Sequence, residues 1–435
     1  MSDVTRRDLL GRGSVLALGM LMGSQSLAHA EELTVSPQDK PNIAPTPVTI
    51  AVIGVGDHGK EILKSLSYLE GAVVKYVCDT YASPLFQKKA LENAPKATFV
   101  TDYKKVLADP EVKGVFVVTP THLHKQIVLD AIAAGKHVFC EAPLAHTVEE
   151  AKEIALAGKN SKSIFQVGIH NRTNPQHHHV KHFMDTGVIG NVVRCSAQWN
   201  VKSVTGWKRA ASTPERESDL NWRVDKSRAN GLLGEIGMHQ IDSASWYLKS
   251  YPLSVSGFKG AGEFPGSLTC VLEYPEGVHL TYDATLGSSF NGNFEEFQGT
   301  SATVLLRGQR GWLFNESDAK KLGWEVYARR EQVGDESGIM LVANASKLLA
   351  QGLEPGRVAQ QTAKQTPTRY ACETFLNSIR VGKPTGTTDA TPAGEEVKMY
   401  ATAEAGFAAT VVGIKANEAV LTGNKITLSK EMFAL

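Results

Sequence analysis

The sequence predicts an α/β protein in which a parallel sheet with helices on both faces is followed by an α/β domain with a large open, mostly antiparallel sheet. Three observations lead to this prediction. A glycine-rich turn near residue 54 joins a buried strand to a helix, strand and helix patterns alternate as far as residue 168, and later segments alternate apolar with polar residues. Alternation of strands with helices is typical of parallel sheets. Alternation of apolar with polar residues is typical of a strand that has one face in contact with solvent.

The composition excludes several classes of protein. The chain has 435 residues, which corresponds to about two to three domains at roughly 150 residues each. Hydrophobic residues make up 42% and charged residues 21%, so the chain can bury a core. Lysine and arginine number 46 against 45 acidic residues, and no basic cluster is present, so we expect no nucleic-acid partner. No apolar run reaches the roughly 18–20 residues of a membrane span, and we expect no membrane anchor.

The N-terminus predicts an export signal. Residues 1–30 place Arg6 and Arg7 ahead of an uncharged stretch and end in an A-x-A sequence, which is typical of a secretory signal peptide. The paired arginines resemble a twin-arginine signal, with Leu9 and Gly11 in place of the usual phenylalanine and lysine. An ordinary secretion signal is the alternative. We therefore expect a periplasmic or secreted protein, exported in the folded state through the twin-arginine pathway.

The segment that follows predicts a dinucleotide-binding unit. An apolar strand over residues 48–53 leads directly into the G-x-G-x-x-G of Gly54, Gly56 and Gly59, and a helical pattern comes next. The first glycine allows a tight turn, the second lets a pyrophosphate approach the backbone, and the third lets the helix pack against the strand. The next strand ends in Asp79, whose carboxylate would accept hydrogen bonds from ribose hydroxyls and repel a 2′-phosphate. The expected cofactor is therefore NAD rather than NADP.

Three more predicted strands continue the parallel sheet, at residues 112–118, 137–140 and 163–168. Short polar motifs follow these strands, and ligands of such sheets bind at the carboxyl ends of the strands. The residues expected to bind the cofactor are Gly54, Gly56, Asp57, His58, Gly59, Asp79, Thr119, Pro120, His124 and Glu141.

The motifs V-x-x-x-T-P-x-x-x-H and A-G-K-H-V-F-C-E-x-P-L-A, each at the end of a strand, resemble the glucose–fructose oxidoreductase, inositol dehydrogenase and rhizopine catabolism family, Gfo/Idh/MocA. The resemblance covers about residues 48–415. It implies a Rossmann domain, a second domain with an open sheet, and action on sugars or polyols through a bound nicotinamide. It also implies a homo-oligomer, a dimer or tetramer, formed through the exposed sheet face.

We therefore divide the chain into a signal peptide (1–30), a proline-rich polar linker or arm (31–47), an NAD-binding Rossmann domain (48–166) and a substrate-binding α/β domain (167–435). Within the substrate-binding domain, alternating patterns predict strands at residues 192–199, 268–273, 278–285 and 302–306. A late helix is predicted at residues 391–413.

The resemblance also implies a reactive constellation, and this sequence departs from it twice. The family lysine of E-K-P is replaced by Ala142, and the aspartate of D-x-x-x-H is replaced by Glu235, whereas His239 is unchanged. Positions i and i+4 share one face of an α-helix, so Glu235 is expected to hold the imidazole of His239. A histidine suits general acid–base work near neutral pH. The expected catalytic residues are therefore His239 and Glu235.

Alanine cannot donate a proton, so another group must act for the lysine or the reaction must differ. The residues that could replace it are His170, Arg172, Lys208, Arg209 and Arg223. The residues expected to bind substrate are His170, Arg172, Trp222, Arg223 and Asp242. Aromatic and cationic side chains at 199–223 suit carbohydrate recognition, although a long connection with its own small core explains them equally well.

Two other features predict structure rather than chemistry. Adjacent residues of the His177–His179 run would point about 100° apart on a helix, and the pair of His178 and His182 lacks a third ligand, so no metal site is expected. The five cysteines are spread along the chain without a C-x-x-C motif and are expected to be buried free thiols.

Three hypotheses for the function remain open. The first is an NAD-dependent oxidoreductase of a sugar or sugar derivative, with a tightly bound cofactor that is recycled internally, because an exported enzyme has no pool of free NAD. The second is an NAD-dependent, redox-assisted glycoside hydrolase or lyase, which the replacement at Ala142 favours because related NAD-dependent glycosidases also lack the lysine. The third is a sugar-binding protein without catalysis.

Overall fold

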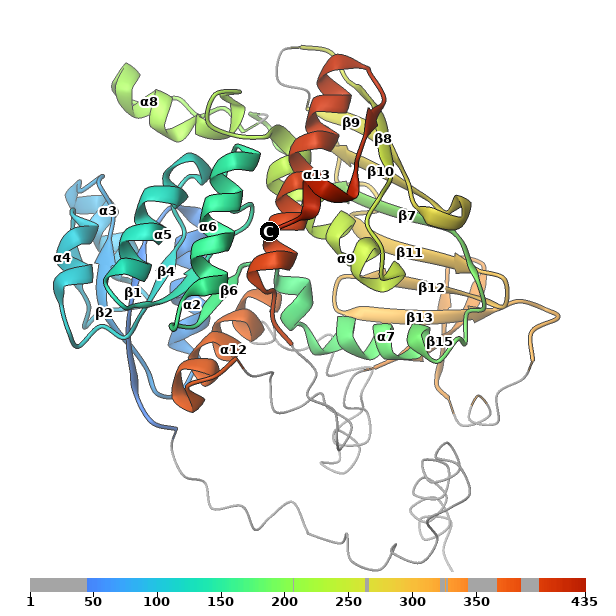
Figure 1. Cartoon of the computed structure of the whole chain (residues 1–435), viewed down its shortest axis with the longest axis horizontal. Helices are drawn as coiled ribbons and strands as arrows, with labels where there is room; N and C mark the ends of the chain where they lie inside the picture. Colours follow the sequence, from blue (N-terminus) through green and yellow to red (C-terminus); the bar gives the residue numbers. More distant parts are fainter. Residues whose placement is uncertain are drawn as a thin grey trace, which may run out of the picture.

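The computed structural model describes residues 45–205, 207–262, 266–320, 325, 328–342, 366–384 and 399–435. The expected signal peptide and most of the expected linker lie outside these residues. Figure 1 shows two domains side by side, the first in blue to teal and the second in green to orange, with helix α13 (Ala403–Thr422) between them. In the described part of the chain, no helix has the length and apolarity to cross a membrane.

The first domain contains a six-stranded, entirely parallel sheet in the order β3-β2-β1-β4-β5-β6. Its strands are β1 (Val48–Ile53), β2 (Ala72–Cys78), β3 (Thr98–Val100), β4 (Gly114–Val117), β5 (His137–Cys140) and β6 (Phe165–Val167). Its helices are α2 (Asp57–Ser67), α3 (Pro84–Leu91), α4 (Tyr103–Ala108), α5 (His124–Ala133) and α6 (Val148–Asn160). The predicted parallel sheet is confirmed, and the short β3 with its flanking helices is an addition.

Helix α12 (Pro367–Val381) comes from the far end of the chain and covers the first sheet (Figure 1). The ring of Phe375 lies 5.1 Å from that of Phe116 and 5.8 Å from that of Phe139, and all three side chains are buried. Since β6 also extends past residue 166, the first domain is not confined to residues 48–166. Burying these rings removes a large apolar area from water, which is the main favourable contribution to such packing.

The second domain contains a ten-stranded sheet in the order β14-β15-β13-β12-β11-β7-β10-β9-β8-β16. The strands are β7 (Val192–Asn200), β8 (Ser254–Lys259), β9 (Ser267–Glu273), β10 (His279–Thr285), β11 (Asn293–Gly299), β12 (Ala302–Arg307), β13 (Arg310–Asn315), β14 (Arg330–Val333), β15 (Glu336–Leu341) and β16 (Ile426–Thr427). β7 and β10 pair in parallel, whereas the other neighbouring strands pair antiparallel. The predicted open, mostly antiparallel sheet is confirmed.

One face of this sheet is covered by helices and the other is more open. The alternating burial of β9 puts Leu268, Cys270 and Leu272 in the core. They pack with residues of α7 (Pro175–Asp185), α9 (Met238–Leu248) and α13. The late helix begins at residue 403 and ends at residue 422, so it starts and ends later than predicted, and residues 391–398 lie outside the described part. All five cysteines are buried and free, as expected.

Candidate active site

The glycine-rich turn has the geometry that its sequence predicts. Gly54 has a φ of 90°, and a Cβ atom there would lie 2.6 Å from the carbonyl oxygen of Val118. A Cβ on Gly59 would lie 2.1 Å from the carbonyl oxygen of Gly54, so α2 packs directly on the turn. A Cβ on Gly56 would meet no atom within 4 Å, so this glycine faces open space. The open space lies at the N-terminus of α2, where unpaired N–H groups favour an anion such as a pyrophosphate.

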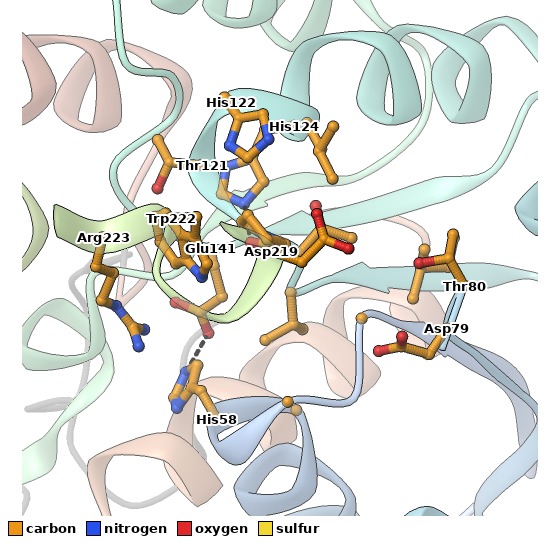
Figure 2. A pocket seen from close by; sticks show the side chains of 18 of the residues that line it. His58, Asp79, Thr80, Thr121, His122, His124, Glu141, Asp219, Trp222 and Arg223 are labelled. Carbon is orange, nitrogen blue, oxygen red and sulfur yellow. Dashed lines mark hydrogen bonds and ion pairs between the residues drawn. The ribbon is translucent and has the colours of Figure 1, made fainter. Parts of the chain in front are cut away.

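This open space belongs to a cavity of about 570 Å³ along the carboxyl ends of β1, β2, β4 and β5. Figure 2 shows Asp79 and Thr80 at one end of the cavity and Trp222, Arg223 and His58 toward the other. The cavity is lined by these of the predicted site residues: Gly54, Gly56, Asp57, His58, Gly59, Asp79, Thr119, Pro120, His124, Glu141, Trp222, Arg223 and Glu235. The remaining predicted residues, His170, Arg172, His239 and Asp242, lie outside its lining.

Asp79 is held rigidly at the end of β2. Its Oδ2 accepts a hydrogen bond from Val55 N and its Oδ1 one from Tyr81 N, each at 2.9 Å. Each carboxylate oxygen keeps a further lone pair for a ligand. The position and charge of Asp79 therefore fit a ribose with free hydroxyls.

Several buried polar atoms of the cavity wall have no hydrogen-bond partner in the described part of the chain. They are Oγ1 of Thr119, Nδ1 of His122 and Nε of Arg223. Buried polar groups without a partner carry a large desolvation cost, so such atoms are ordinarily satisfied by water or a ligand. Together with the open cradle at Gly56, they fit a bound dinucleotide. His122 was not among the predicted residues, although it lies in the T-P-x-x-x-H motif.

The segment at residues 207–228 covers the cavity from the second domain. Arg209 forms an ion pair with Asp57, Arg216 lies 3.8 Å from the ring centroid of Tyr81, and Arg223 lies 4.7 Å from that of Trp222. The hydrogen bond from Arg209 is the main reason why the pKa of Asp57 is lowered. Asp57 therefore anchors the covering segment, which is a different role from the predicted contact with the cofactor.

His124 acts on the shape of the site through backbone contacts. Its Nδ1 lies 3.1 Å from the carbonyl oxygen of Pro143 and its Nε2 lies 2.9 Å from that of Thr119. Burial lowers its pKa, so the ring is neutral and donates through one nitrogen. The ring ties the loop after β4 to the loop that carries Glu141 and Ala142. His124 is a positioning residue.

Glu141 joins two histidines from distant parts of the chain. Its Oε1 lies 2.9 Å from Nε2 of His58 and 3.1 Å from Nε2 of His170. Burial opposes ionisation of this carboxyl, but the charges and hydrogen bonds of the two histidines outweigh it and hold its pKa well below the usual range. In turn, although burial opposes protonation, Glu141 and Glu61 raise the pKa of His58 to about 10. Figure 2 shows the contact of His58 with Glu141 at the edge of the cavity.

Glu235 does not hold His239 as predicted. Its Oε2 accepts a hydrogen bond from Thr121 Oγ1 at 2.9 Å and its Oε1 one from Asn230 N at 3.2 Å. The reason is that Leu233–Gly237 is a π-helical turn ahead of α9. The i and i+4 positions of an α-helix share a face, but the wider π turn shifts this spacing. Glu235 consequently lies against the first domain, and burial raises its pKa.

His239 lies instead beside the cluster that Glu141 forms with His58 and His170. Its ring centroid is 6.4 Å from that of His170. Burial, followed by the charge of His170, lowers the pKa of His239 to about 4. The imidazole is therefore neutral at pH 7 and can accept a proton.

Arg172 and Asp242 bond to each other rather than to the cavity. Nε and Nη2 of Arg172 donate to the two carboxylate oxygens of Asp242 at 2.7 and 2.9 Å, and the guanidinium lies 5.3 Å from the ring centroid of Trp246. Such a two-pronged pair is rigid. It fastens the 3₁₀ turn His170–Thr173 to α9 and so sets His170 beside His239. Their predicted substrate-binding role is replaced by a positioning role.

The three histidines of the 177–179 run diverge, as predicted. Nδ1 of His177 lies 3.3 Å from the hydroxyl of Tyr247, and Nε2 of His178 lies 2.7 Å from the carbonyl oxygen of Arg172. The ring of His179 packs edge-on against Phe183. These separate contacts give the run a structural role.

The parallel sheet, the glycine-rich turn and the cavity define a two-domain protein whose first domain binds a dinucleotide. Residues 48–169 match the model of the oxidoreductase family, NAD-binding Rossmann fold, and residues 177–312 match the Gfo/Idh/MocA C-terminal domain. The chain therefore belongs to the Gfo/Idh/MocA family, and its first domain is an NAD-binding domain.

Individual relatives are distant. Levoglucosan dehydrogenase of Pseudarthrobacter phenanthrenivorans is 26% identical over 258 residues, which cover 53% of this chain and 64% of that protein. The chain thus spans less than two thirds of this relative. 2,7-Anhydro-N-acetylneuraminate hydratase of Escherichia coli is 26% identical over 60% of this chain and 67% of its own length. A glycosyl hydrolase family 109 protein of Shewanella putrefaciens is 29% identical over 35% of this chain and 37% of its own.

Solved structures share the fold. Levoglucosan dehydrogenase in complex with NADH superposes with a TM-score of 0.68 at 19% identity and covers 88% of this chain and all of its own. An oxidoreductase domain protein from Kribbella flavida gives the same TM-score at 18% identity and covers 88% of this chain.

Proposed function

We propose that this protein is an NAD-dependent oxidoreductase that oxidises a hydroxyl group of a sugar or sugar derivative. The observation that carries the proposal is the neutral His239 beside the cluster of His58, Glu141 and His170, of which His58 and Glu141 line the NAD-binding cavity. Two relatives, levoglucosan dehydrogenase and 2,7-anhydro-N-acetylneuraminate hydratase, are named for sugar derivatives and support this substrate class.

The residues of this chain would divide the work as follows. The turn at Gly54–Gly59 and the carboxylate of Asp79 would hold the dinucleotide, which supplies a two-electron hydride acceptor when it is bound. A ring nitrogen of His239 would take the proton of the substrate hydroxyl. The covering segment with Trp222 and Arg223 would exclude water from the cavity and contact the sugar.

A redox-assisted glycoside hydrolase is the second candidate. It is favoured by Ala142, which leaves the site without the lysine of E-K-P, and by the partial similarity to a glycosyl hydrolase family 109 protein. Such an enzyme would oxidise a sugar hydroxyl, eliminate the glycosidic substituent, add water and take the hydride back.

One experiment separates the candidates. The protein would be purified without added cofactor, denatured, and the released nicotinamide measured by mass and absorbance. The intact protein would then be assayed on free sugars with a second carbonyl compound, and on glycosides with no NAD supplied. Oxidation of one sugar coupled to reduction of the second compound supports the oxidoreductase. Net glycoside hydrolysis supports the hydrolase, and sugar binding without turnover contradicts both.

We also propose that the protein is exported folded with its NAD bound, and that it forms a dimer or tetramer through the open sheet face. The twin-arginine pattern of residues 1–30 supports the first point. Replacing both Arg6 and Arg7 with lysine should abolish export of a fused reporter that requires the twin-arginine route. Light scattering of the purified protein tests the second point, and a monomeric mass would contradict it.

A further inference from the structure

We propose that His58, Glu141 and His170 form a binding site for one divalent first-row transition-metal ion at the edge of the cavity. The site stands on geometry, whereas the role given to it below rests on the proposed function. It departs from the sequence-based expectation that the chain has no metal site, which considered only the His177–His179 run and His182.

The three side chains converge on one point. The ligand atoms of His58, Glu141 and His170 all lie within 4.8 Å of one another. The residues come from three segments: α2, the loop after β5, and the 3₁₀ turn after β6. Two imidazoles and one carboxylate are a donor set that zinc and iron use in catalytic sites, where a further position stays open.

The second ring nitrogen of each histidine, Nδ1, lies beside an oxygen atom, as is usual for histidines that bind a metal ion through Nε2. Nδ1 of His58 lies 3.2 Å from Oε2 of Glu61, and Nδ1 of His170 lies 3.4 Å from Oγ1 of Thr368. The hydroxyl of Thr368 donates its only proton to Oε1 of Glu61 at 2.7 Å. Metal-ligating histidines almost always donate their second ring nitrogen to such an outer partner, which fixes the tautomer.

This network has a consequence for the inner nitrogens. Since Glu61 accepts from His58, and since Thr368 has already given its proton to Glu61, both Nδ1 atoms must act as donors. A neutral imidazole with a proton on Nδ1 presents a lone pair at Nε2. Both Nε2 atoms lie within hydrogen-bond distance of Oε1 of Glu141, so without a metal ion a proton on each Nε2 is donated to this carboxylate. A metal ion at this point would take the place of these protons, because nitrogen ligands bind a metal in their unprotonated form, and the three ligand atoms already converge.

The site lies where the family lysine is absent, because Ala142 directly follows Glu141. A metal ion here would restore the positive charge beside the substrate hydroxyl and lower the pKa of that hydroxyl. During oxidation the hydroxyl proton would pass to His239, and the carbinol hydrogen would leave with two electrons to the nicotinamide. Charge and atoms balance without a further reactant.

The test is metal binding by the purified full chain, without sugar or NAD. After treatment with a chelator and dialysis, Zn²⁺ would be titrated by calorimetry, and Co²⁺ by its visible absorption bands, which report the ligand geometry. We expect one ion per chain. The variants His58→Asn and His170→Asn should each weaken binding more than 100-fold, since outer partners alone account for about 10–100-fold.

Two further variants control the result. His146→Asn removes a half-buried histidine whose Nδ1 lies 3.2 Å from Glu150 in the same domain, and it should bind metal as the unaltered chain does. Thr368→Val removes only the outer partner and should weaken Zn²⁺ binding about 10-fold or more. Circular dichroism and thermal melting verify that each variant is folded.

The proposal is overturned if the unaltered chain binds no Zn²⁺ and shows no Co²⁺ bands, or if Thr368→Val and both histidine variants bind as it does. These outcomes do not depend on turnover. Metal binding without sugar oxidation would leave the site standing and contradict the proposed function. Sugar oxidation by a chain that binds no metal ion would support the proposed function and contradict the site.

Discussion

The hydroxyl of Thr121 donates a hydrogen bond of 2.9 Å to Glu235, and this bond links the loop after β4 to the π-helical turn before α9. Both residues are buried, with Glu235 at 7% exposure. The pair therefore connects the NAD-binding domain to the helix that carries His239.

The first prediction concerns the stability of this connection. Thr121→Val keeps the shape of the side chain but removes the donor, so a buried carboxyl oxygen loses a partner. We expect the free energy of unfolding to fall by about 1–3 kcal/mol, measured by chemical denaturation. Thr281→Val, on β10, is the control and should change the free energy of unfolding by less than about 0.5 kcal/mol. Equal effects of the two substitutions would mean that the bond to Glu235 adds nothing.

The second prediction concerns the choice of cofactor. Asp79→Asn keeps one oxygen acceptor but removes the negative charge that would repel a 2′-phosphate. We expect the ratio of NADP to NAD affinity, measured by calorimetry, to rise about 10-fold or more, which corresponds to about 1.4 kcal/mol. Asp102→Asn is the matched control, because Asp102 caps α4 through Lys104 N and asparagine is an equally good cap. An unchanged ratio would remove the argument for Asp79.

The third prediction concerns acid–base catalysis. His239→Asn removes the proton acceptor while leaving the dinucleotide cradle intact. We expect kcat to fall by about 10²–10⁴-fold with little change in the dissociation constant of NAD. His279→Asn, at the exposed first residue of β10, should leave both quantities unchanged. A kcat that survives the loss of His239 would require a different base.

The fourth prediction concerns pH and a buried carboxyl in the large sheet. Burial raises the pKa of Glu295 from 4.5 to about 7. Between these values the folded state holds a proton that the unfolded state has lost, so this group stabilises the protein less as pH rises from 4.5 to 7. Linkage predicts that Glu295→Gln stabilises the protein by about 2 kcal/mol more at pH 8 than at pH 5.

Chemical denaturation at the two pH values measures this difference. Glu296→Gln, the next residue along β11, is the control because its half-buried side chain lies on the other face of the strand. A difference for Glu295→Gln no larger than that for the control would show that Glu295 titrates normally.

Local sequence patterns predicted much of this molecule. The strand at residues 48–53, the glycines at 54, 56 and 59, and Asp79 lie within one continuous βαβ unit, so their spacing alone defines their arrangement. Four of the ten strands of the second sheet, β7, β9, β10 and β12, were predicted for a similar reason, since period-two alternation indicates burial on one face.

The side-chain partners could not be predicted in this way. His58 and Glu141 are 83 residues apart, and Arg172 and Asp242 are 70 apart, so only the fold brings them together. One weak signal existed for the first pair, because each follows a parallel strand at the same edge of the sheet. Glu235 lies in a π-helical turn and bonds to Thr121 rather than to His239, and the periodicity of residues 233–248 does not predict this turn.

The position of α12 bears on how the chain matures. The last strand of the first sheet ends at residue 167, yet the helix that covers Phe116 and Phe139 comes only at residues 367–381. During synthesis, part of the core of the first domain therefore stays uncovered until two hundred further residues have been added. Thr368, on the same helix, also reaches Glu61 behind the histidine cluster, so the first domain and its site become complete only when the C-terminal part of the chain has emerged.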